Sequence, residues 1–263
     1  MPRDRRDGMI HALWDELARF PMADAEVACR HLMQTLAGWL KADNAAWVGT
    51  ARLLDGKQAA RDPMCGWRSR TVMFLNPPGE AEALLAKRGL ADHRTEFGLT
   101  LIATSRLAGR FRVHRLRDGF VDMAAFRKTL HYQTFYRDLG VDDRLWIGTP
   151  LTPQVESFFV FDRRNTRTRF SAAEVRLAGD TLRGLARLQR QLMYGHGLAL
   201  IESPLTAMEQ RVVHLLLSDK SEKEIAAALK QSVHTTHTHI KQVYRKYGAK
   251  GRAGLMAIWL SRW

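Results

Sequence analysis

Hydrophobic positions in the first forty residues recur every three or four positions, the spacing of an amphipathic helix. Pro21 interrupts this pattern, because proline has no backbone N–H to donate within a helix. The pattern therefore predicts two helices that are separated at Pro21. The apolar positions are Leu13, Leu17, Phe20, Val27, Leu32, Leu36, Trp39 and Leu40.

From residue 45 the pattern changes to one that is typical of strands. Segments 45–54 and 67–75 are rich in β-branched and aromatic residues, and turn-forming pairs, Asp55-Gly56 and Asp62-Pro63, lie between them. Asn76-Pro77-Pro78-Gly79 ends the second strand, and residues 80–87 suit a short helix. The further predictions are strands over 111–116, 145–148 and 155–161, and a helical stretch over about 123–138.

Ser171 begins the next predicted helix, because Ser171 and Glu174 have the spacing of a capping box. One apolar seam then predicts a helix of roughly 23 residues that ends at Gly195-His196-Gly197. This helix either packs against the sheet of its own chain or pairs with its copy in a dimer, with Gln189 setting the register. The seam comprises Val175, Ala178, Leu182, Leu185, Gln189 and Leu192.

The last sixty residues divide into four short helices by local chemistry. The first two helices begin with capping boxes, Thr206 with Glu209 and Ser221 with Glu224. The third begins at the N-cap Ser232 and ends at Gly248, which suits a left-handed conformation, and an apolar fourth helix starts near Arg252. Two short capped helices joined by a tight turn, the second basic and polar on one face, are typical of a helix-turn-helix.

Composition narrows the class of protein. The chain has 263 residues, 46% of them hydrophobic and 26% charged, which favours a folded protein of one or two domains over a disordered one. No apolar run reaches the roughly 18 residues of a membrane span, and no secretion signal follows the amino terminus. We therefore expect a cytoplasmic protein. Its two cysteines, Cys29 and Cys65, predict neither a disulfide framework nor a zinc site.

The charge points to a polyanionic partner. Lys and Arg number 41 against 27 Asp and Glu, a net charge of +14. The segment 203–263 has ten Lys and Arg against four Asp and Glu, so its charge per residue is more than twice that of the rest. Such an imbalance favours nucleic acid or an anionic membrane surface.

The carboxy-terminal segment resembles the LuxR/NarL-type DNA-binding domain. The matching positions follow the order and spacing of that family: Leu205, Thr206, Glu209, Val213, Leu216, Glu224, Ile225, Ala226, Leu229, Ser232, Thr235, His239, Ile240, Lys246, Gly248 and Arg252. One departure is that Thr236 and His237 stand where the family usually has Val followed by Lys or Arg. We expect the fold to tolerate this change and the base preference to differ.

The resemblance implies that the third helix, residues 232–247, lies in the major groove of double-stranded DNA. Outward positions would contact base edges, and others would contact phosphates. The base contacts are assigned to His237, Thr238 and Lys241, and the phosphate contacts to Ser232, Thr235, Arg245, Lys246 and Lys223. His234 and His237 are one turn apart and could share a metal, but no third ligand is evident, so no metal site is predicted.

The amino-terminal segment resembles a GAF- or PAS-like sensory domain in its layout. A phosphorylated receiver is excluded, since the acidic pair Asp142-Asp143 lies mid-chain beside a turn. An acyl-homoserine-lactone front end has the right length and layout but lacks Trp-x3-Tyr ahead of Asp62-Pro63, and it stays open. Aromatic residues are expected in the core, with a subset available to line an apolar pocket: Trp47, Trp67, Phe74, Tyr132, Phe135, Tyr136, Trp146, Phe158 and Phe159.

No nucleophile, dinucleotide, phosphate-loop or zinc-protease motif is present, so neither an enzyme nor a cofactor is predicted. The sequence thus predicts an α+β protein: a GAF-like sensory domain over 1–170, an exit or dimerisation helix over 171–194, a linker over 195–203 and a four-helix helix-turn-helix domain over 204–263. We expect a dimeric, DNA-binding transcriptional regulator controlled by an unknown small molecule. The alternatives are a small-molecule-binding or enzymatic domain with a protein-interaction tail, and a regulator whose front domain only dimerises.

Overall fold

The computed structural model describes residues 3–77, 79, 100, 104–119, 121–198 and 205–260. It divides into two compact units. The N-terminal unit comprises Met1–Asp15 and Arg30–Ala186, and the C-terminal unit comprises Glu16–Cys29 and Arg187–Trp263. Across the described ranges, no helix combines the length and the apolar character that a membrane span requires.

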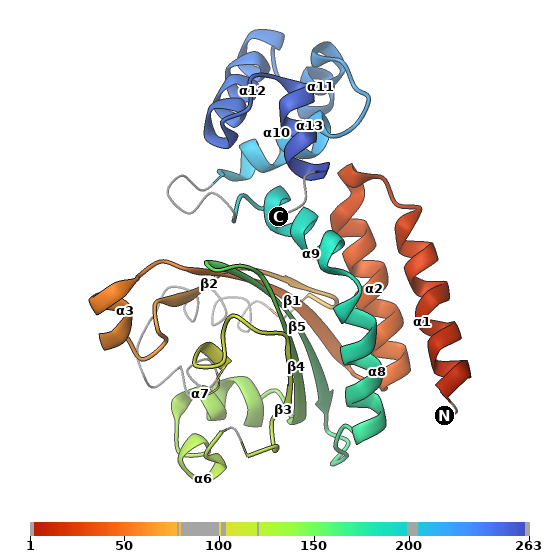
Figure 1. Ribbon diagram of the computed structural model, residues 1–263, viewed down its shortest axis with the longest axis vertical. Coiled ribbons are helices and arrows are strands. Elements are labelled where there is room, and N and C mark those ends of the chain that lie inside the picture. The colour runs from red at the N-terminus through yellow and green to blue at the C-terminus, as the bar shows by residue number, and fades with distance from the viewer. Residues whose placement is uncertain are drawn as a thin grey trace. The chain divides into compact units, whose positions relative to one another are not determined.

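A five-stranded antiparallel sheet forms the centre of the N-terminal unit (Figure 1). Its order is β2-β1-β5-β4-β3, with β1 at Asn44–Arg52, β2 at Trp67–Phe74, β3 at Arg112–Arg115, β4 at Val141–Thr152 and β5 at Val155–Arg164. All five predicted strands are present, and an all-helical segment follows them, which confirms the α+β class. The last two strands are longer than predicted, because their hairpin pairing extends the ladder from Val141 to Arg164.

The two faces of the sheet differ in character, because successive side chains of a strand point to opposite faces. Odd-numbered residues form an apolar layer: Trp47, Leu145, Ile147, Phe159 and Phe161, all buried. Figure 1 shows α2 and α8 beside the sheet on one side and α6 and α7 on the other. Even-numbered residues of the same strands line a cavity on the opposite face.

The amino-terminal helices follow the predicted break at Pro21. α1 spans Arg3–Ala18, a short 3-10 turn, η1, spans Met22–Asp24, and α2 spans Ala25–Leu40. Other local predictions were incomplete. A short helix, α3 at Gly56–Arg61, occupies the segment that the sequence predicted as a turn. The helix predicted over 80–87 lies outside the described residues.

The single helix predicted over 123–138 was wrong. Three short pieces replace it: α6 at Met123–Phe126, α7 at Leu130–Tyr132 and a π-helical turn, η3, at Gln133–Arg137. The break follows from a local capping bond. The hydroxyl of Thr129 accepts the backbone N–H of Tyr132, which starts a new helix instead of continuing the first.

The helix predicted from Ser171 is also two helices, α8 at Ala172–Arg183 and α9 at Ala186–Gly195. Trp14 explains the break at Gly184. Its indole N–H donates to the carbonyl of Thr181 over 3.0 Å, and its ring lies so near Gly184 that a Cβ there would approach it to 2.3 Å. The Thr181 carbonyl is thus occupied, and the N–H of Leu185 bonds to Leu182 instead.

Five of the six seam residues, Ala178, Leu182, Leu185, Gln189 and Leu192, are buried, and Val175 is half-buried. α8 contacts β3 and β4, as the packing interpretation predicted, whereas Gln189 and Leu192 of α9 belong to the C-terminal unit. Dimerisation through the same helices stays a prediction.

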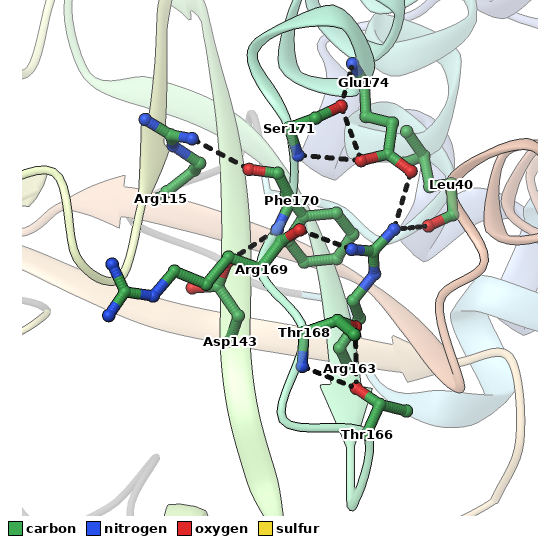
Figure 2. Close-up of polar contacts among 10 residues, drawn as sticks. All are labelled: Leu40, Arg115, Asp143, Arg163, Thr166, Thr168, Arg169, Phe170, Ser171 and Glu174. Carbon is green, nitrogen blue, oxygen red and sulfur yellow. Dashed lines mark hydrogen bonds and ion pairs between the residues drawn. The ribbon is translucent and has the colours of Figure 1, made fainter.

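A polar network attaches the start of α8 to the sheet (Figure 2). The Arg163 guanidinium donates to the carbonyls of Leu40 and Arg169 over 2.8 and 2.5 Å and to the Glu174 carboxylate over 2.6 Å. The predicted capping box of Ser171 and Glu174 is present, so one carboxylate both caps α8 and pairs with Arg163. α8 is therefore held at a fixed position on β5.

The C-terminal unit contains the four predicted helices: α10 at Ala207–Leu216, α11 at Glu222–Leu229, α12 at Val233–Tyr247 and α13 at Arg252–Leu260. Both predicted capping boxes and the Ser232 cap are present, and Gly248 takes a left-handed conformation with φ of 65°. Tyr194 at the end of α9 joins the core of this unit. Its ring lies 5.0 Å from that of Trp259, and its carbonyl accepts the Tyr247 hydroxyl over 2.5 Å.

Thr236 is a polar residue in this core, and we expect Thr236→Val to stabilise the C-terminal unit. The Thr236 side chain is fully buried, and its hydroxyl has no hydrogen-bond partner among the described residues. Valine has the same shape without the unsatisfied hydroxyl, so the free energy of unfolding should rise by about 1–2 kcal/mol. Urea unfolding of both proteins measures this. Thr238→Val, at an exposed site of the same helix, is the control and should show no gain; equal effects would contradict the prediction.

Candidate DNA-binding helix and ligand cavity

One face of α12 is buried and the opposite face is exposed. Thr236, Ile240, Val243 and Tyr247 point into the core of the C-terminal unit at helical spacing. The exposed set comprises Val233, His234, Thr235, His237, Thr238, Lys241 and Arg245. All three residues predicted to contact bases, His237, Thr238 and Lys241, therefore lie on the solvent side of the helix.

His237 is oriented by a residue that the sequence analysis did not identify. Its Nδ1 lies 2.9 Å from a carboxylate oxygen of Glu222, in the first turn of α11. If Nδ1 carries the proton that Glu222 accepts, neutral His237 presents Nε2 to the solvent as an acceptor. The spacing of residues along the chain does not indicate this pair, because Glu222 and His237 belong to different helices.

The predicted phosphate contacts differ in their surroundings. Ser232 and Thr235 lie together at the N-cap of α12, their hydroxyl oxygens 2.8 Å apart, and Arg245 and Lys223 are exposed. Lys246 is instead directed at Glu209, with Nζ 2.6 Å from the carboxylate of that buried residue. A phosphate contact from Lys246 would have to share its ammonium group with this pair.

Arg252 holds the turn between α10 and α11. Its guanidinium donates to the carbonyl of Leu216, the last residue of α10, and to those of Ser218 and Lys220 in the following turn. The last carbonyls of a helix lack a backbone partner within the helix, so this cation stabilises the end of α10 and the turn after it. Arg252 thereby joins the start of α13 to the turn that leads into α11.

A cavity of about 210 Å³ lies on the even-numbered face of the sheet in the N-terminal unit. Six of the nine aromatic residues that the sequence marked as possible lining are in its wall: Trp67, Phe74, Phe135, Tyr136, Trp146 and Phe158. Trp47 and Phe159 point to the other face, as alternation along β1 and β5 requires.

The cavity wall also contains charged residues that the sequence analysis did not assign. They are Arg68, Arg112, Arg144, Glu156, Asp162 and Arg164. The sequence does contain a signal for these residues. Along β4 and β5, charged residues occupy even positions and therefore face the same way as Phe158 and Val160. Burying a charged side chain on the inner face of a sheet costs free energy unless the charge is paired within the protein or binds a ligand.

Comparison with known proteins identifies the C-terminal segment. Residues 203–258 match the family described as bacterial regulatory proteins, luxR family. These residues form a LuxR-family DNA-binding domain. Over 49 residues the chain is 45% identical to the spore germination protein GerE of Bacillus subtilis, a match that spans 19% of this chain and 66%, just under two thirds, of GerE.

Three solved structures are similar to larger parts of the chain at lower sequence identity. The VqsR LBD domain of Pseudomonas aeruginosa is 20% identical and covers 71% of this chain and 98% of its own, with a TM-score of 0.48. SdiA in complex with octanoyl-rac-glycerol is 17% identical over 97% of this chain and 94% of its own, with a TM-score of 0.45. Another structure, of Escherichia coli SdiA, is 14% identical, covering 96% and 95%, with a TM-score of 0.42.

Acid is expected to destabilise the LuxR-family domain partly through Glu209. Burial alone would raise the pKa of this carboxyl, but hydrogen bonds from Lys246 and Thr206 outweigh burial and hold the pKa below its ordinary value of 4.5. A group with a lowered folded-state pKa stabilises the fold above its unfolded pKa, and this contribution is lost as the pH falls through the folded-state value. Stability should therefore fall below about pH 4.5.

Urea unfolding at pH 7 and at stepwise lower pH tests this expectation. Glu209→Gln should lower stability at pH 7 and flatten the acid dependence, because its side chain no longer titrates. Asp219→Asn, at an exposed position of the same unit, is the control and should leave the pH profile unchanged. A Glu209→Gln profile parallel to that of the unaltered protein would show that Glu209 does not contribute.

Proposed function

We propose that the protein is a transcriptional regulator that binds paired DNA half-sites as a dimer and responds to a small molecule in its N-terminal unit. It acts in the cytoplasm, where it has access to the chromosome. The observation that carries this proposal is the exposed polar and basic face of α12 within a LuxR-family domain. The cavity in the N-terminal unit, with its largely apolar wall, supports control by a ligand.

The two groups of residues on this surface have different roles in the proposal. His237, Thr238 and Lys241 contact base edges: the Lys241 ammonium donates to guanine, and the exposed Thr238 methyl meets thymine. Ser232, Thr235, Arg245 and Lys223 contact phosphates and fix the register of the helix on DNA. Glu222 positions His237 so that its Nε2 faces the groove.

Lys241→Ala tests the DNA-binding surface. Lys241 is exposed and makes no ion pair with the described residues, so its loss should leave the fold intact. A base contact of this kind contributes about 1–3 kcal/mol, which predicts a 5- to 150-fold weaker affinity for the specific site. Sequencing of genomic fragments captured by the full-length protein identifies that site, and a gel-shift titration at fixed salt measures the loss.

Lys250→Ala is the matched control, because it removes the same charge from an exposed position after α12. This variant should lower the affinity for specific and non-specific DNA by the same small factor. A two-fold symmetric site among the captured fragments supports the dimer. If Lys241→Ala and Lys250→Ala behave identically, α12 does not read bases through Lys241.

A further inference from the structure

An acidic residue lies beside the exposed face of α12. Glu222 is in the first turn of α11, and its carboxylate oxygen Oε1 lies 2.9 Å from Nδ1 of His237. A carboxylate at a DNA-binding surface is repelled by the phosphates, so it weakens binding unless it has another role. The segment 203–263 is otherwise basic, with ten Lys and Arg against four Asp and Glu. The contact with His237 indicates what the role of Glu222 is.

The backbone on both sides of the turn fixes the two side chains relative to each other. The capping box at Ser221 sets the start of α11. α11 ends at Lys230, which takes a left-handed conformation with φ of 55°, and the Ser232 side chain caps α12 directly afterwards. The two helices also contact each other. The contact of Glu222 with His237 therefore joins two helices of fixed geometry and does not depend on a long loop.

The carboxylate determines which ring nitrogen of His237 carries the proton. An ionised carboxylate only accepts hydrogen bonds, so Nδ1 is the donor in this contact. A neutral imidazole has one N–H, and its Nε2 is then an acceptor. No described residue bonds to Nε2, and the His237 side chain is 46% exposed. The contact with Glu222 therefore leaves a hydrogen-bond acceptor on the open edge of the ring.

The major groove of DNA offers few partners to an acceptor. Its hydrogen-bond donors are the exocyclic amines, N6 of adenine and N4 of cytosine, whereas guanine and thymine present only acceptors there. An acceptor on α12 thus distinguishes A and C from G and T. Lys241, four positions after His237 on the same exposed face, is the opposite case, because an ammonium group only donates. The two side chains therefore require different bases.

We propose that His237, with its Nδ1–H held by Glu222, accepts a hydrogen bond from the exocyclic amine of adenine or cytosine and so selects A or C at one position of each half-site. Glu222 is a positioning residue, since it contacts the ring and not the base. This inference rests on the proposed function, in which α12 lies in the major groove. It adds a class of base that the exposure of His237 alone does not determine.

Selection of binding sites from random DNA by the full-length protein tests the class of base. The selection is made at pH 8, where an ordinary imidazole is neutral. We expect A or C at one position of each half-site, and His237→Ala should remove the preference at that position alone. Glu222→Ala should weaken the preference. Glu222→Lys should reverse it to G or T, because an ammonium group donates to Nδ1 and the ring proton then lies on Nε2. Asp219→Lys makes the same change of charge at an exposed position of this unit and should have no such effect.

Base analogues separate an acceptor from a donor at His237. Purine lacks the N6 amine of adenine, 2-pyrimidinone lacks the N4 amine of cytosine, and an adenine analogue with carbon in place of N7 lacks only that acceptor. Loss of the amine should weaken binding about 3- to 10-fold, as expected for one hydrogen bond, and loss of N7 should not. His237→Ala should abolish the effect of the amine. NMR spectra of nitrogen-labelled histidine should show the proton on Nδ1 of His237, and on Nε2 in Glu222→Lys.

Each contrary outcome has a distinct meaning. Weaker binding on loss of N7 but not of the amine would show that the ring donates, which overturns the proposal. An A-or-C preference that survives His237→Ala and is lost in Glu222→Ala would mean that Glu222 itself contacts the base. An unchanged preference in Glu222→Lys would show that the carboxylate does not set the ring proton. All three leave the proposed function in place if Lys241→Ala weakens the specific site, whereas failure to select any site would overturn both. Far-UV circular dichroism of each variant confirms that the fold is retained.

Discussion

Glu156→Gln is expected to lower the free energy of unfolding of the N-terminal unit by about 3–5 kcal/mol, because it leaves the buried cation of Arg112 without a counter-charge. The carboxylate of Glu156 also accepts the backbone N–H of Gly109 over 2.7 Å, while Arg112 donates to the carbonyls of Thr104 and Arg110. This single pair therefore fixes the segment 104–110 to β3 and β5. The glutamine amide provides one acceptor where the carboxylate provides two.

Hydrogen exchange of peptides from β1 and β5, together with urea unfolding, measures the effect. Asp55→Asn, an exposed acid of the same unit, is the matched control and should change stability by less than about 0.5 kcal/mol. A second variant separates charge from packing. Arg112→Met with Glu156→Met removes both charges, so it should be more stable than Glu156→Gln alone. If Glu156→Gln unfolds like the unaltered protein, the pair is not a major source of stability.

The C-terminal domain could be predicted almost completely from sequence because its signals are local. Capping boxes at Thr206 and Ser221 and the left-handed glycine at Gly248 set the helix ends through residues three or four positions apart. The interpretation of α12 as the helix that contacts bases depended likewise on residues that are close together in the sequence. Contacts between helices, such as that of Glu222 with His237, could not be predicted from these local patterns.

The N-terminal unit could be predicted only in part because distant residues decide its details. The predicted helix from Ser171 breaks at Gly184 because Trp14, 170 positions earlier, occupies the space beside it. Strand positions were recognisable from composition, whereas the strand order was not. The cavity depends on that order, since Arg144 and Asp162 face each other only when β4 pairs with β5.

Arg163 provides the second large effect, because it joins three segments of the N-terminal unit. Its side chain is 93% buried, stacks on Phe170 at 4.5 Å and donates to Leu40, Arg169 and Glu174 (Figure 2). Arg163→Met keeps much of the apolar contact but leaves two carbonyls and one carboxylate oxygen without this donor. We expect the free energy of unfolding to fall by about 3 kcal/mol or more.

Arg169→Met is the matched control, since the Arg169 side chain is exposed and only its carbonyl takes part in the network. It should leave stability within about 0.5 kcal/mol of the unaltered protein. Hydrogen exchange at the first turn of α8 provides a local measure and should accelerate in Arg163→Met alone. Equal exchange in the two variants would mean that the Ser171–Glu174 capping box holds α8 without Arg163. The start of α8 after β5 would then be fixed by local capping alone, as the helix starts of the LuxR-family domain are.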